Sequence, residues 1–499
     1  MSPDRTRDKL ETTTGATVNL ATIIDRHAPD RLALVDGDRH TMTYGEIRTH
    51  ADRVRSYLTN RGVRSDDRVS VLAGNEPLFV GAALGALGVG ARVIPMKPTN
   101  PLAELERKLA VIQPAVVLVG EDGQWVHDHA EQLAVPLVNI TDVVNQFPNT
   151  DAPPIVGRTT NDIAFMMLTS GVSGDPKVAM LSHGSLAAAQ ATISTGANSG
   201  LTGDDIVFGA LPVAHIFGLN PMLLTSLRVG ATVILVRRFD IAESLELVRR
   251  HRITVLAGAP PMWRAWSLTD VPEGTFSSVR VALSGAAALP ATVCRDMADR
   301  HGVSVEEGYG MTETGAVLTT NRGIEVKLGS VGQVVPGVEM VLVDADGQVV
   351  EPGDSGEIVV RGPNIFSGYY DDPTTTGQVL TEDGWFWTGD VGVFDDDGYL
   401  FLVDRVKDLI IVSGFNVYPA EVEKILAAHP DVTAAVVVGG ENIETGETVI
   451  AHICGDPDLD ELDAWAKERL TRYKCPTEYR VVDELPIAPT GKLVRRALR

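Results

Sequence analysis

The chain has 499 residues, of which 44% are hydrophobic and 22% charged, so it can form more than one hydrophobic core and is neither disordered nor fibrous in composition. Acidic residues outnumber Lys and Arg by 66 to 43, a net charge of −23, which argues against a general binder of nucleic acid or anionic lipid. The three cysteines are far apart and form no CxxC pair, so we expect neither a disulfide framework nor a zinc site.

The N-terminus does not have the pattern of a secretory signal, because its first fifteen residues are polar and charged. The longest apolar stretch, residues 78–91, is shorter than the roughly 20 residues that a membrane span needs. We therefore expect a cytoplasmic protein with a buried helix at this position and no transmembrane segment. Peripheral contact with a membrane stays open.

In chain order, the first predicted element is an amphipathic helix that begins at the capping box formed by Thr43 and Glu46. Helical patterns follow at residues 78–91 and 102–112. Short apolar runs, which are candidate strands, lie between and after the helices, at residues 69–72, 92–95, 115–119, 163–168, 231–236, 254–257 and 279–283. This alternation predicts parallel sheets covered by helices.

The pattern changes after about residue 385. Residues 394–399 have the composition of a hairpin turn between two apolar runs. The last hundred residues alternate short strands with two amphipathic helices. The predicted fold class is therefore α/β, with a large N-terminal body of mostly parallel sheets and helices, followed by a small α+β domain.

The sharpest local feature is a loop at residues 169–177, directly after an apolar run. It combines glycines, hydroxyl side chains and a lysine: Thr169, Ser170, Gly171, Ser173, Gly174 and Lys177. Such a loop can present backbone N–H groups and a cation to a triphosphate, although its spacing is not that of a Walker A loop. A surface turn rich in Ser and Gly is an equally good interpretation of this segment alone.

Two later segments could contact a nucleotide. At residues 308–314 the ring of Tyr309 could lie against a flat base, and the carboxylate of Glu313 could hold Mg²⁺ on phosphates. Farther along, Asp390 could accept both ribose hydroxyls, with Arg405 beside it. Taken singly, these segments could equally be a tight loop and a solvated turn.

Three further features have ordinary explanations as well as functional ones. His215 lies among apolar residues and could be a core histidine. Residues 284–287, Ser-Gly-Ala-Ala, would let a ligand approach the backbone, or form only a strand-to-helix turn. The basic tail around Lys492 could reach an anionic centre or be a frayed terminus.

Together and in this order, the segments resemble the adenylate-forming superfamily of acyl-CoA synthetases, luciferases and peptide-synthetase adenylation domains, over residues 20–499. Residues 383–423 are most similar to medium- and long-chain fatty acyl-CoA synthetases. The resemblance implies ATP, Mg²⁺, CoA and a small carboxylic acid as ligands. The acid would react with ATP to give acyl-AMP and pyrophosphate, and a thiol would then take the acyl group after rotation of the C-terminal domain.

The resemblance also implies domains and roles. The large domain would span residues 1–404 and include a β-barrel-like subdomain, and the mobile C-terminal domain would span residues 405–499 with Lys407 as the hinge. The loop at residues 169–177 would hold the β- and γ-phosphates. Gly285, Ala286 and Ala287 would form the backbone wall of the adenine and acyl pocket. The nucleoside would also contact Tyr309, Gly310, Asp390 and Arg405.

The catalytic roles follow from the same resemblance. Thr312 would lie near the α-phosphate, Glu313 would bind Mg²⁺, and His215 would lie beside the acyl carboxylate. Lys492 would span that carboxylate and the α-phosphate and offset their repulsion in the transition state. Gly414 would line the channel for the pantetheine arm of CoA.

The chain departs from the family pattern at three positions. Val172 replaces a threonine and Val178 a glycine of the phosphate loop, and Ala214 replaces the usual aromatic residue before the histidine. These changes affect the expected rate of ATP use and the shape of the acyl pocket, not the reaction class.

Two alternatives stay open. The first is an acyl-AMP ligase that loads a carrier protein, although residues 314–328 leave no room there for the long insertion typical of such ligases. The second is a non-catalytic binder of nucleotide or acyl-CoA, which the altered loop suggests and the presence of Lys492 disfavours. Aromatic residues make up only 5% of the chain, which weakly favours an aliphatic acid; the sequence does not indicate an oligomeric state.

Overall fold

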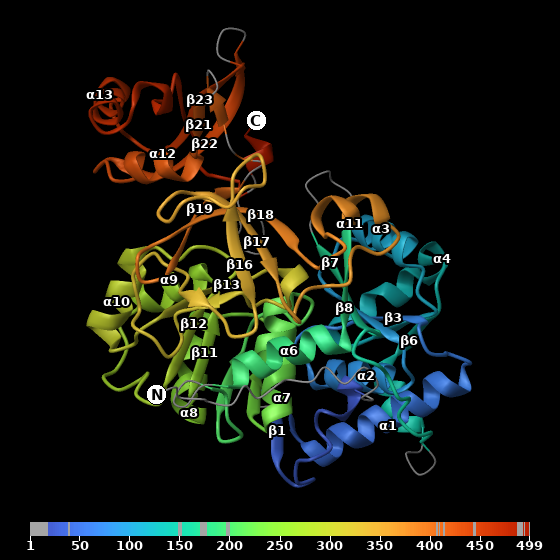
Figure 1. Cartoon of the computed structure of the whole chain (residues 1–499). Coiled ribbons are helices and arrows are strands. Elements are labelled where there is room, and N and C mark those ends of the chain that lie inside the picture. The colour runs from blue at the N-terminus through green and yellow to red at the C-terminus, as the bar shows by residue number, and fades with distance from the viewer. Residues whose placement is uncertain are drawn as a thin grey trace, which may run out of the picture. The chain divides into compact units, whose positions relative to one another are not determined.

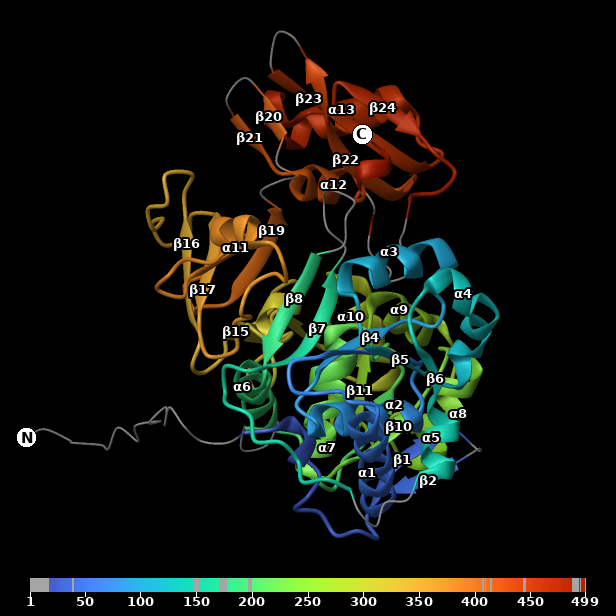
Figure 2. The same cartoon turned by 90° about the vertical axis from the view of Figure 1, so that its right-hand side faces the viewer.

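The computed structural model describes residues 18–37, 40–147, 152–169, 177–195, 200–405, 408, 410–412, 415–442, 446–486, 493 and 495–498 (Figures 1 and 2). The chain divides into two compact units. Unit 1 comprises Met1–Phe239 with Met311–Ala316 and Pro363–Pro373, and unit 2 comprises Asp240–Gly310, Val317–Gly362 and Thr374–Arg499. Two short segments, 311–316 and 363–373, thus return to unit 1 from the middle of the chain.

Unit 1 is built on a six-stranded sheet. Its strands, in spatial order, are β6 (Leu137–Asn139), β5 (Val116–Val119), β3 (Arg68–Leu72), β4 (Arg92–Met96), β7 (Ile163–Thr169) and β8 (Lys177–Ser182). All neighbouring pairs are parallel except β7 and β8, which run antiparallel and lie side by side in Figure 2. The central strands are mostly apolar and buried, as expected for parallel strands inside a covered sheet.

Four further strands of unit 1 pair in the order β9 (Ile206–Gly209), β10 (Thr232–Leu235), β1 (Leu32–Asp36) and β2 (His40–Thr43). The helices of the unit are α1 (Tyr44–Asn60), α2 (Pro77–Gly88), α3 (Leu102–Ile112), α4 (Ala130–Leu133), α5 (Ile140–Gln146), α6 (His183–Ser194) and α7 (Thr225–Val229). Helix α1 packs closely on α2 at Gly85, which has no side chain. A Cβ at this position would lie 2.7 Å from the Ala51 carbonyl oxygen of α1.

Unit 2 begins with parallel strands β11 (Val255–Gly258), β12 (Val281–Ser284) and β13 (Glu306–Tyr309), followed in the same sheet by antiparallel β14 (Thr319–Thr320) and β15 (Gln333–Val334). Its helices here are α8 (Ile241–His251), α9 (Pro260–Leu268) and α10 (Ala291–His301). An antiparallel sheet follows, made of β16 (Glu339–Val343), β17 (Gly356–Arg361), β18 (Phe386–Phe394) and β19 (Leu400–Arg405), with α11 (Pro373–Val379) between β17 and β18.

The C-terminal part of unit 2 has its own hydrophobic core. Its sheet has the order β21 (Phe415–Val417), β20 (Ile410–Val412), β23 (Gly446–Gly455) and β22 (Val432–Asn442), with β24 (Glu478–Val481) parallel to β23. The helices α12 (Pro419–Leu426) and α13 (Leu459–Arg469) supply Val422, Leu426 and Leu462 to this core (Figure 1).

The predicted fold class is confirmed: an α/β body of mixed, mostly parallel sheets precedes a small domain with a largely antiparallel sheet. Every apolar run predicted as a strand is one, and residues 394–399 form the predicted turn between β18 and β19, closed by a bond from Asp395 N–H to the Tyr399 carbonyl. Residues 78–91 contain α2, which is buried along its whole length. Among the residues that the structure describes, no helix is both long and apolar enough to cross a bilayer. The division at residues 404 and 405 stays a prediction.

Candidate active site

The two ends of the predicted phosphate loop are held together by strand pairing. Thr169 ends β7, Lys177 begins β8, and the two residues are register partners. The Thr169 hydroxyl also donates to the Lys177 carbonyl at 3.3 Å. The loop between them, with Ser170, Gly171, Ser173 and Gly174, lies outside the described residues. What the structure shows is therefore how the loop leaves the sheet and returns to it.

Val178, which stands where the family pattern has glycine, is a core residue. It lies in β8, is 2% exposed, and belongs to a hydrophobic cluster with Ile94 and Met166. A β-branched side chain suits a buried strand position. The substitution thus stabilises the strand that follows the loop and removes no backbone donor from the loop itself.

Glu313 lies in a short 3₁₀ turn, Thr312–Thr314, and is only 6% exposed. The Tyr369 hydroxyl donates to its Oε1 at 2.8 Å. The Phe366 N–H donates to the Glu313 carbonyl at 2.8 Å, and the Asn364 side chain donates to the Thr314 carbonyl at 3.0 Å. The segment 363–373 therefore holds both the backbone and the carboxylate of this turn.

The same segment is attached to β8. The Tyr370 N–H donates to the Val178 carbonyl at 2.8 Å, and the Met180 N–H donates to the Gly368 carbonyl at 3.0 Å. The ammonium group of Lys177 lies 5.0 Å from the centre of the Tyr369 ring. Tyr369 is thus in contact with the cation at the end of the phosphate loop and with the predicted metal-binding carboxylate.

The Tyr369 hydroxyl is a donor that stays protonated. Burial, and then the charge of Glu313, raise the pKa of Tyr369 well above its ordinary value of 10. Sequence reasoning did not identify Tyr369, because it is 56 residues away from Glu313 in the chain and stands in no charged or glycine-rich motif.

The residues around Glu313 fit a magnesium ion that arrives with its nucleotide. Among the described residues there is no cluster of three His, Cys, Asp or Glu side chains that could hold a metal alone. Mg²⁺ is usually bound through one or two protein carboxylates together with phosphate oxygens of a substrate. A single buried carboxylate that shares Tyr369 with the Lys177 ammonium fits that arrangement.

His215 lies in a turn before the π-helix Gly218–Leu224. Its Nδ1 accepts the Phe217 N–H at 3.3 Å, which places the proton of a neutral ring on Nε2. Gly218 is required here, because a Cβ would lie 2.3 Å from the Pro212 carbonyl oxygen. The π-helix is a geometry frequently found at functional sites.

Asn220 connects this π-helix to the Glu313 turn. Its amide donates to the Gly315 carbonyl at 3.0 Å and accepts from the Gln190 side chain at 3.0 Å, and both side chains are fully buried. Sequence analysis missed Asn220 and Asn364; a polar amide inside a run of buried apolar residues is the signal that could have indicated Asn220.

Unit 2 contains the predicted nucleoside contacts. The Tyr309 hydroxyl donates to Asp390 Oδ2 at 2.8 Å, and both residues are more than nine-tenths buried. Gly310 follows Tyr309 directly at the end of β13. The structure therefore brings together two residues that the sequence analysis placed on one nucleoside. Arg405 is the backbone register partner of Asp390 in β19.

The loop after β12 has a strained backbone. Ala286 has a φ of +72°, a left-handed conformation that is uncommon for residues with a side chain and that clusters at functional sites. Gly285 precedes it, and Ala287 follows with an exposed side chain. Glu307, which sequence analysis also missed, closes the loop, since its Oε1 accepts the Leu289 N–H at 3.0 Å.

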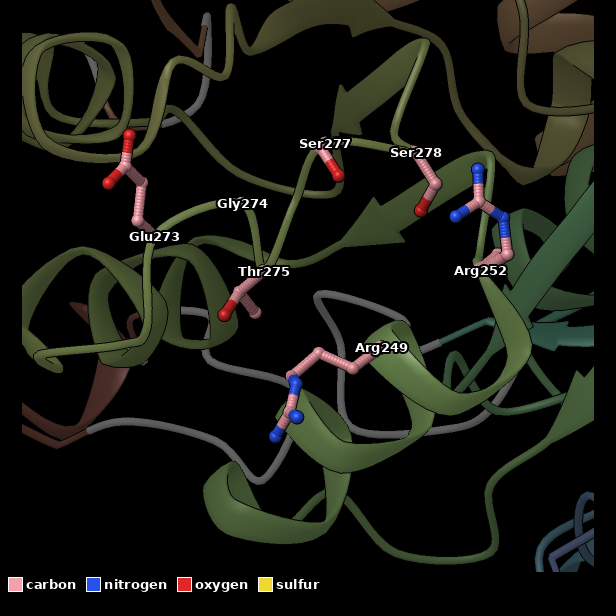
Figure 3. Close-up of a pocket in the computed structure, with 7 residues that line it drawn as sticks. All are labelled: Arg249, Arg252, Glu273, Gly274, Thr275, Ser277 and Ser278. Atoms are coloured by element: carbon pink, nitrogen blue, oxygen red, sulfur yellow. The ribbon is translucent and has the colours of Figure 1, made fainter.

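A separate pocket of about 180 Å³ lies before the amino ends of β11 and β12 (Figure 3). Arg249 and Arg252 lie at the end of α8, before β11, and residues 274–278 precede β12. In open α/β sheets ligands bind outside the carboxyl ends of the strands. The loop at residues 285–287 is at that end, whereas the cavity is at the amino end, so it is not part of the candidate site.

The remaining predicted site residues are Lys407, Gly414 and Lys492, and they lie outside the described residues. Their roles stay predictions, as does that of Thr312, which the structure places in the same turn as Glu313.

Comparisons of this chain with family models, with protein sequences and with solved structures agree with one another. A family model described as AMP-binding enzyme matches residues 23–370, and one described as AMP-binding enzyme C-terminal domain matches residues 421–492. The chain is 34% identical to 4-coumarate–CoA ligase 1 of Oryza sativa subsp. japonica, over 94% of this chain and 89% of that protein. ATP-bound MatB from Rhodopseudomonas palustris has a TM-score of 0.90 at 30% identity, covering 97% of this chain and 98% of that one. A Mycobacterium tuberculosis fatty acyl CoA synthetase has a TM-score of 0.79 at 27% identity, covering 96% and 97%.

Proposed function

Because the chain belongs to the family of AMP-binding enzymes and is an acid–CoA ligase that forms AMP, we propose that it activates an apolar monocarboxylic acid, in the first place a fatty acid. The acid's carboxylate attacks the α-phosphorus of ATP, a new O–P bond forms, and the bond to pyrophosphate breaks. The CoA thiol then attacks the acyl carbon of the adenylate, forms the thioester and releases AMP.

The observation that carries the adenylation step is the group formed by Glu313, Tyr369 and Lys177. It places a buried carboxylate and a cation at the exit of the phosphate loop, within one compact unit. Lys177 would bind the β- and γ-phosphates, and Glu313 would hold Mg²⁺. Bound Mg²⁺ would neutralise phosphate charge, which favours attack by an anionic carboxylate.

The other residues orient the reactants. Tyr309 and Asp390 would bind the adenine and the ribose, and His215 would lie beside the acyl carboxylate. Lys492 would approach the α-phosphate during adenylation and leave it when the C-terminal domain rotates about Lys407. Gly414 would then line the path of the thiol.

The proposal of an apolar acid rests on the absence of cations from the sequence near the acyl position. Residues 211–224 around His215 and residues 281–294, which begin with β12, contain no Lys or Arg. A dicarboxylic acid would need a cation for its second carboxylate, because an unpaired buried charge is strongly unfavourable. A monocarboxylic acid needs none.

An aryl acid is the second candidate. It is favoured by the similarity to 4-coumarate–CoA ligase, whereas residues 383–423 and the low aromatic content favour an aliphatic acid. The final acceptor is proposed to be CoA, and a carrier protein is the alternative.

The test is a competition among acids. Purified protein is incubated with Mg·ATP, CoA, aliphatic acids of graded length, 4-coumaric acid and a dicarboxylic acid, and mass spectrometry measures AMP, acyl-AMP and acyl-CoA. Aliphatic acyl-CoA of one length class would support the proposal, and coumaroyl-CoA would select the second candidate. A dicarboxylic product would contradict the proposal of an apolar acid. Acyl-AMP without thioester would indicate a carrier protein as the acceptor. No AMP from any acid would favour a non-catalytic binder.

A further inference from the structure

Tyr369, in the segment 363–373, contacts both the predicted metal-binding carboxylate and the predicted phosphate-binding cation. Its hydroxyl donates to Glu313 Oε1 at 2.8 Å, and its ring lies 5.0 Å from the Lys177 ammonium. The side chain is 8% exposed, so it is held from all sides. Tyr369 therefore lies behind the candidate site and contacts its functional groups.

The position of the Tyr369 ring is set by its backbone and by a second ring. Tyr369 forms an antiparallel bridge with Ala179 of β8, between the hydrogen bonds of Gly368 and Tyr370 to the same strand. The Phe366 ring packs edge-on against it, with 5.0 Å between ring centres. Because β8 begins at Lys177, the tyrosine is in fixed register with the end of the phosphate loop.

We propose that Tyr369 is a positioning residue for adenylation: its hydroxyl orients the Glu313 carboxylate toward Mg²⁺, and its ring holds Lys177 toward the phosphates. This inference rests on the proposed function, because it assigns the two groups to one Mg·ATP. Because both groups contact one side chain, Tyr369 would fix the position of the metal-binding carboxylate relative to the phosphate-binding cation.

Two variants separate the hydroxyl from the ring. Tyr369→Phe removes the hydrogen bond to Glu313 and keeps the face on which Lys177 lies. Tyr369→Leu removes both contacts. Tyr370→Phe is the matched control, because it deletes a hydroxyl from the next residue, which packs against the hydrophobic core instead.

The experiment uses the full chain and measures the affinity for a non-hydrolysable ATP analogue by calorimetry. The affinity is measured at a series of Mg²⁺ concentrations and in EDTA. In Tyr369→Phe we expect the Mg²⁺ concentration for half-maximal tightening of binding to rise about tenfold, as for other partners of metal ligands. Binding in EDTA should not change. In Tyr369→Leu, binding in EDTA should also weaken by about threefold, because the cation loses its ring.

A purely structural role would give another result. It would lower the thermal midpoint of Tyr369→Phe and leave the Mg²⁺ midpoint at the value of wild type and of Tyr370→Phe, and that outcome would overturn the proposal. The binding assay contains no acid, so a wild type that binds Mg·ATP but activates no acid would contradict the proposed function alone. A wild type that binds no nucleotide would overturn both.

Discussion

Each of the two units contains a buried tyrosine that donates its hydroxyl to a buried carboxylate at 2.8 Å: Tyr369 to Glu313 in unit 1, and Tyr309 to Asp390 in unit 2. The surroundings differ. In unit 1 the tyrosine ring contacts Lys177, and the carboxylate lies in the 3₁₀ turn Thr312–Thr314. In unit 2 the tyrosine ends a parallel strand, and the carboxylate lies in an antiparallel sheet. The same hydrogen bond thus serves two predicted duties, phosphate and metal in one unit and nucleoside in the other.

The largest effect should come from a charge that neither pair supplies. In Lys492→Ala, the rate of acyl-AMP formation should fall by at least about a hundredfold, because two anions then approach each other without this cation. Thioester formation from supplied acyl-AMP should continue, since the predicted rotation of the C-terminal domain would remove the lysine from the site before that step. Single-turnover assays of the two half-reactions measure both quantities.

Lys407→Pro is the matched variant for the second half-reaction. A proline restricts the backbone at the predicted hinge, so acyl-AMP should form and transfer to CoA should slow. Equal loss of both half-reactions in Lys492→Ala would remove its assigned role. Normal CoA transfer in Lys407→Pro would show that the chain turns elsewhere.

Glu313→Gln tests the unit 1 pair. The amide oxygen can still accept the Tyr369 hydroxyl, so the change removes the charge and little else. We expect the adenylation rate to fall by about a hundredfold, because Mg²⁺ loses its protein ligand, and adenosine binding to be unchanged. Stopped-flow release of pyrophosphate and calorimetry with adenosine measure the two. If adenosine binding weakened as well, the assignment of phosphate and metal to the unit 1 pair and of the nucleoside to the unit 2 pair would be contradicted.

The parts of the site that the sequence could predict are those whose chemistry lies in one local segment. The strands followed from apolar runs, and the turn with Glu313, the Tyr309 loop and Asp390 stand in short patterns that resemble a family. The family and the fold class were confirmed on this basis.

The parts that it could not predict depend on long-range pairing. Tyr369 reaches Glu313 only because the segment 363–373 pairs with β8, which lies almost two hundred residues earlier in the chain. Asn220 donates to the Gly315 carbonyl and Glu307 accepts the Leu289 N–H, and a backbone partner carries no side-chain signal in the sequence. The Val178 change counts as a departure of the phosphate loop in the sequence pattern, whereas in the structure its side chain belongs to the core beside β8. Such contacts require the register of strands, which local patterns do not contain.

Asp390→Asn tests the unit 2 pair and should have a smaller effect. An amide presents one acceptor where the carboxylate has two and carries no charge, so ATP binding should weaken by about tenfold, as expected for a lost hydrogen bond to a charged group. The preference for ATP over 2′-deoxy-ATP should shrink with it. Tyr309→Phe is the control, since it keeps the ring for adenine. An unchanged ribose preference in Asp390→Asn would contradict the ribose assignment.

The smallest expected effect concerns a carboxylate that lacks the tyrosine partner of the other two. In the part of the chain that the structure describes, Glu306 Oε2 has no hydrogen-bond partner, and burial raises the pKa of Glu306 to about 7 from its ordinary value of 4.5, against the opposing charges of Arg322 and Arg280. The folded state therefore holds this proton more tightly than the unfolded state, so stability declines as the pH rises from about 4.5 to about 7.

Glu306→Gln should remove this decline. Each pKa unit corresponds to ~1.4 kcal/mol. Because the side chain is partly exposed, we expect a net gain of only about 1 kcal/mol, or roughly 1 °C in the thermal midpoint of a chain of this length, at pH 8 and none at pH 4. Glu339→Gln is the control of opposite sign, because the hydrogen bond from Arg361 lowers the pKa of Glu339, so its charged form is the one that folding favours. Thermal melts at both pH values measure the two variants. If Glu306→Gln gained no stability at pH 8, a carboxylate without a tyrosine donor would not destabilise this fold. The hydroxyls of Tyr369 and Tyr309 would then orient their carboxylates and not stabilise the fold.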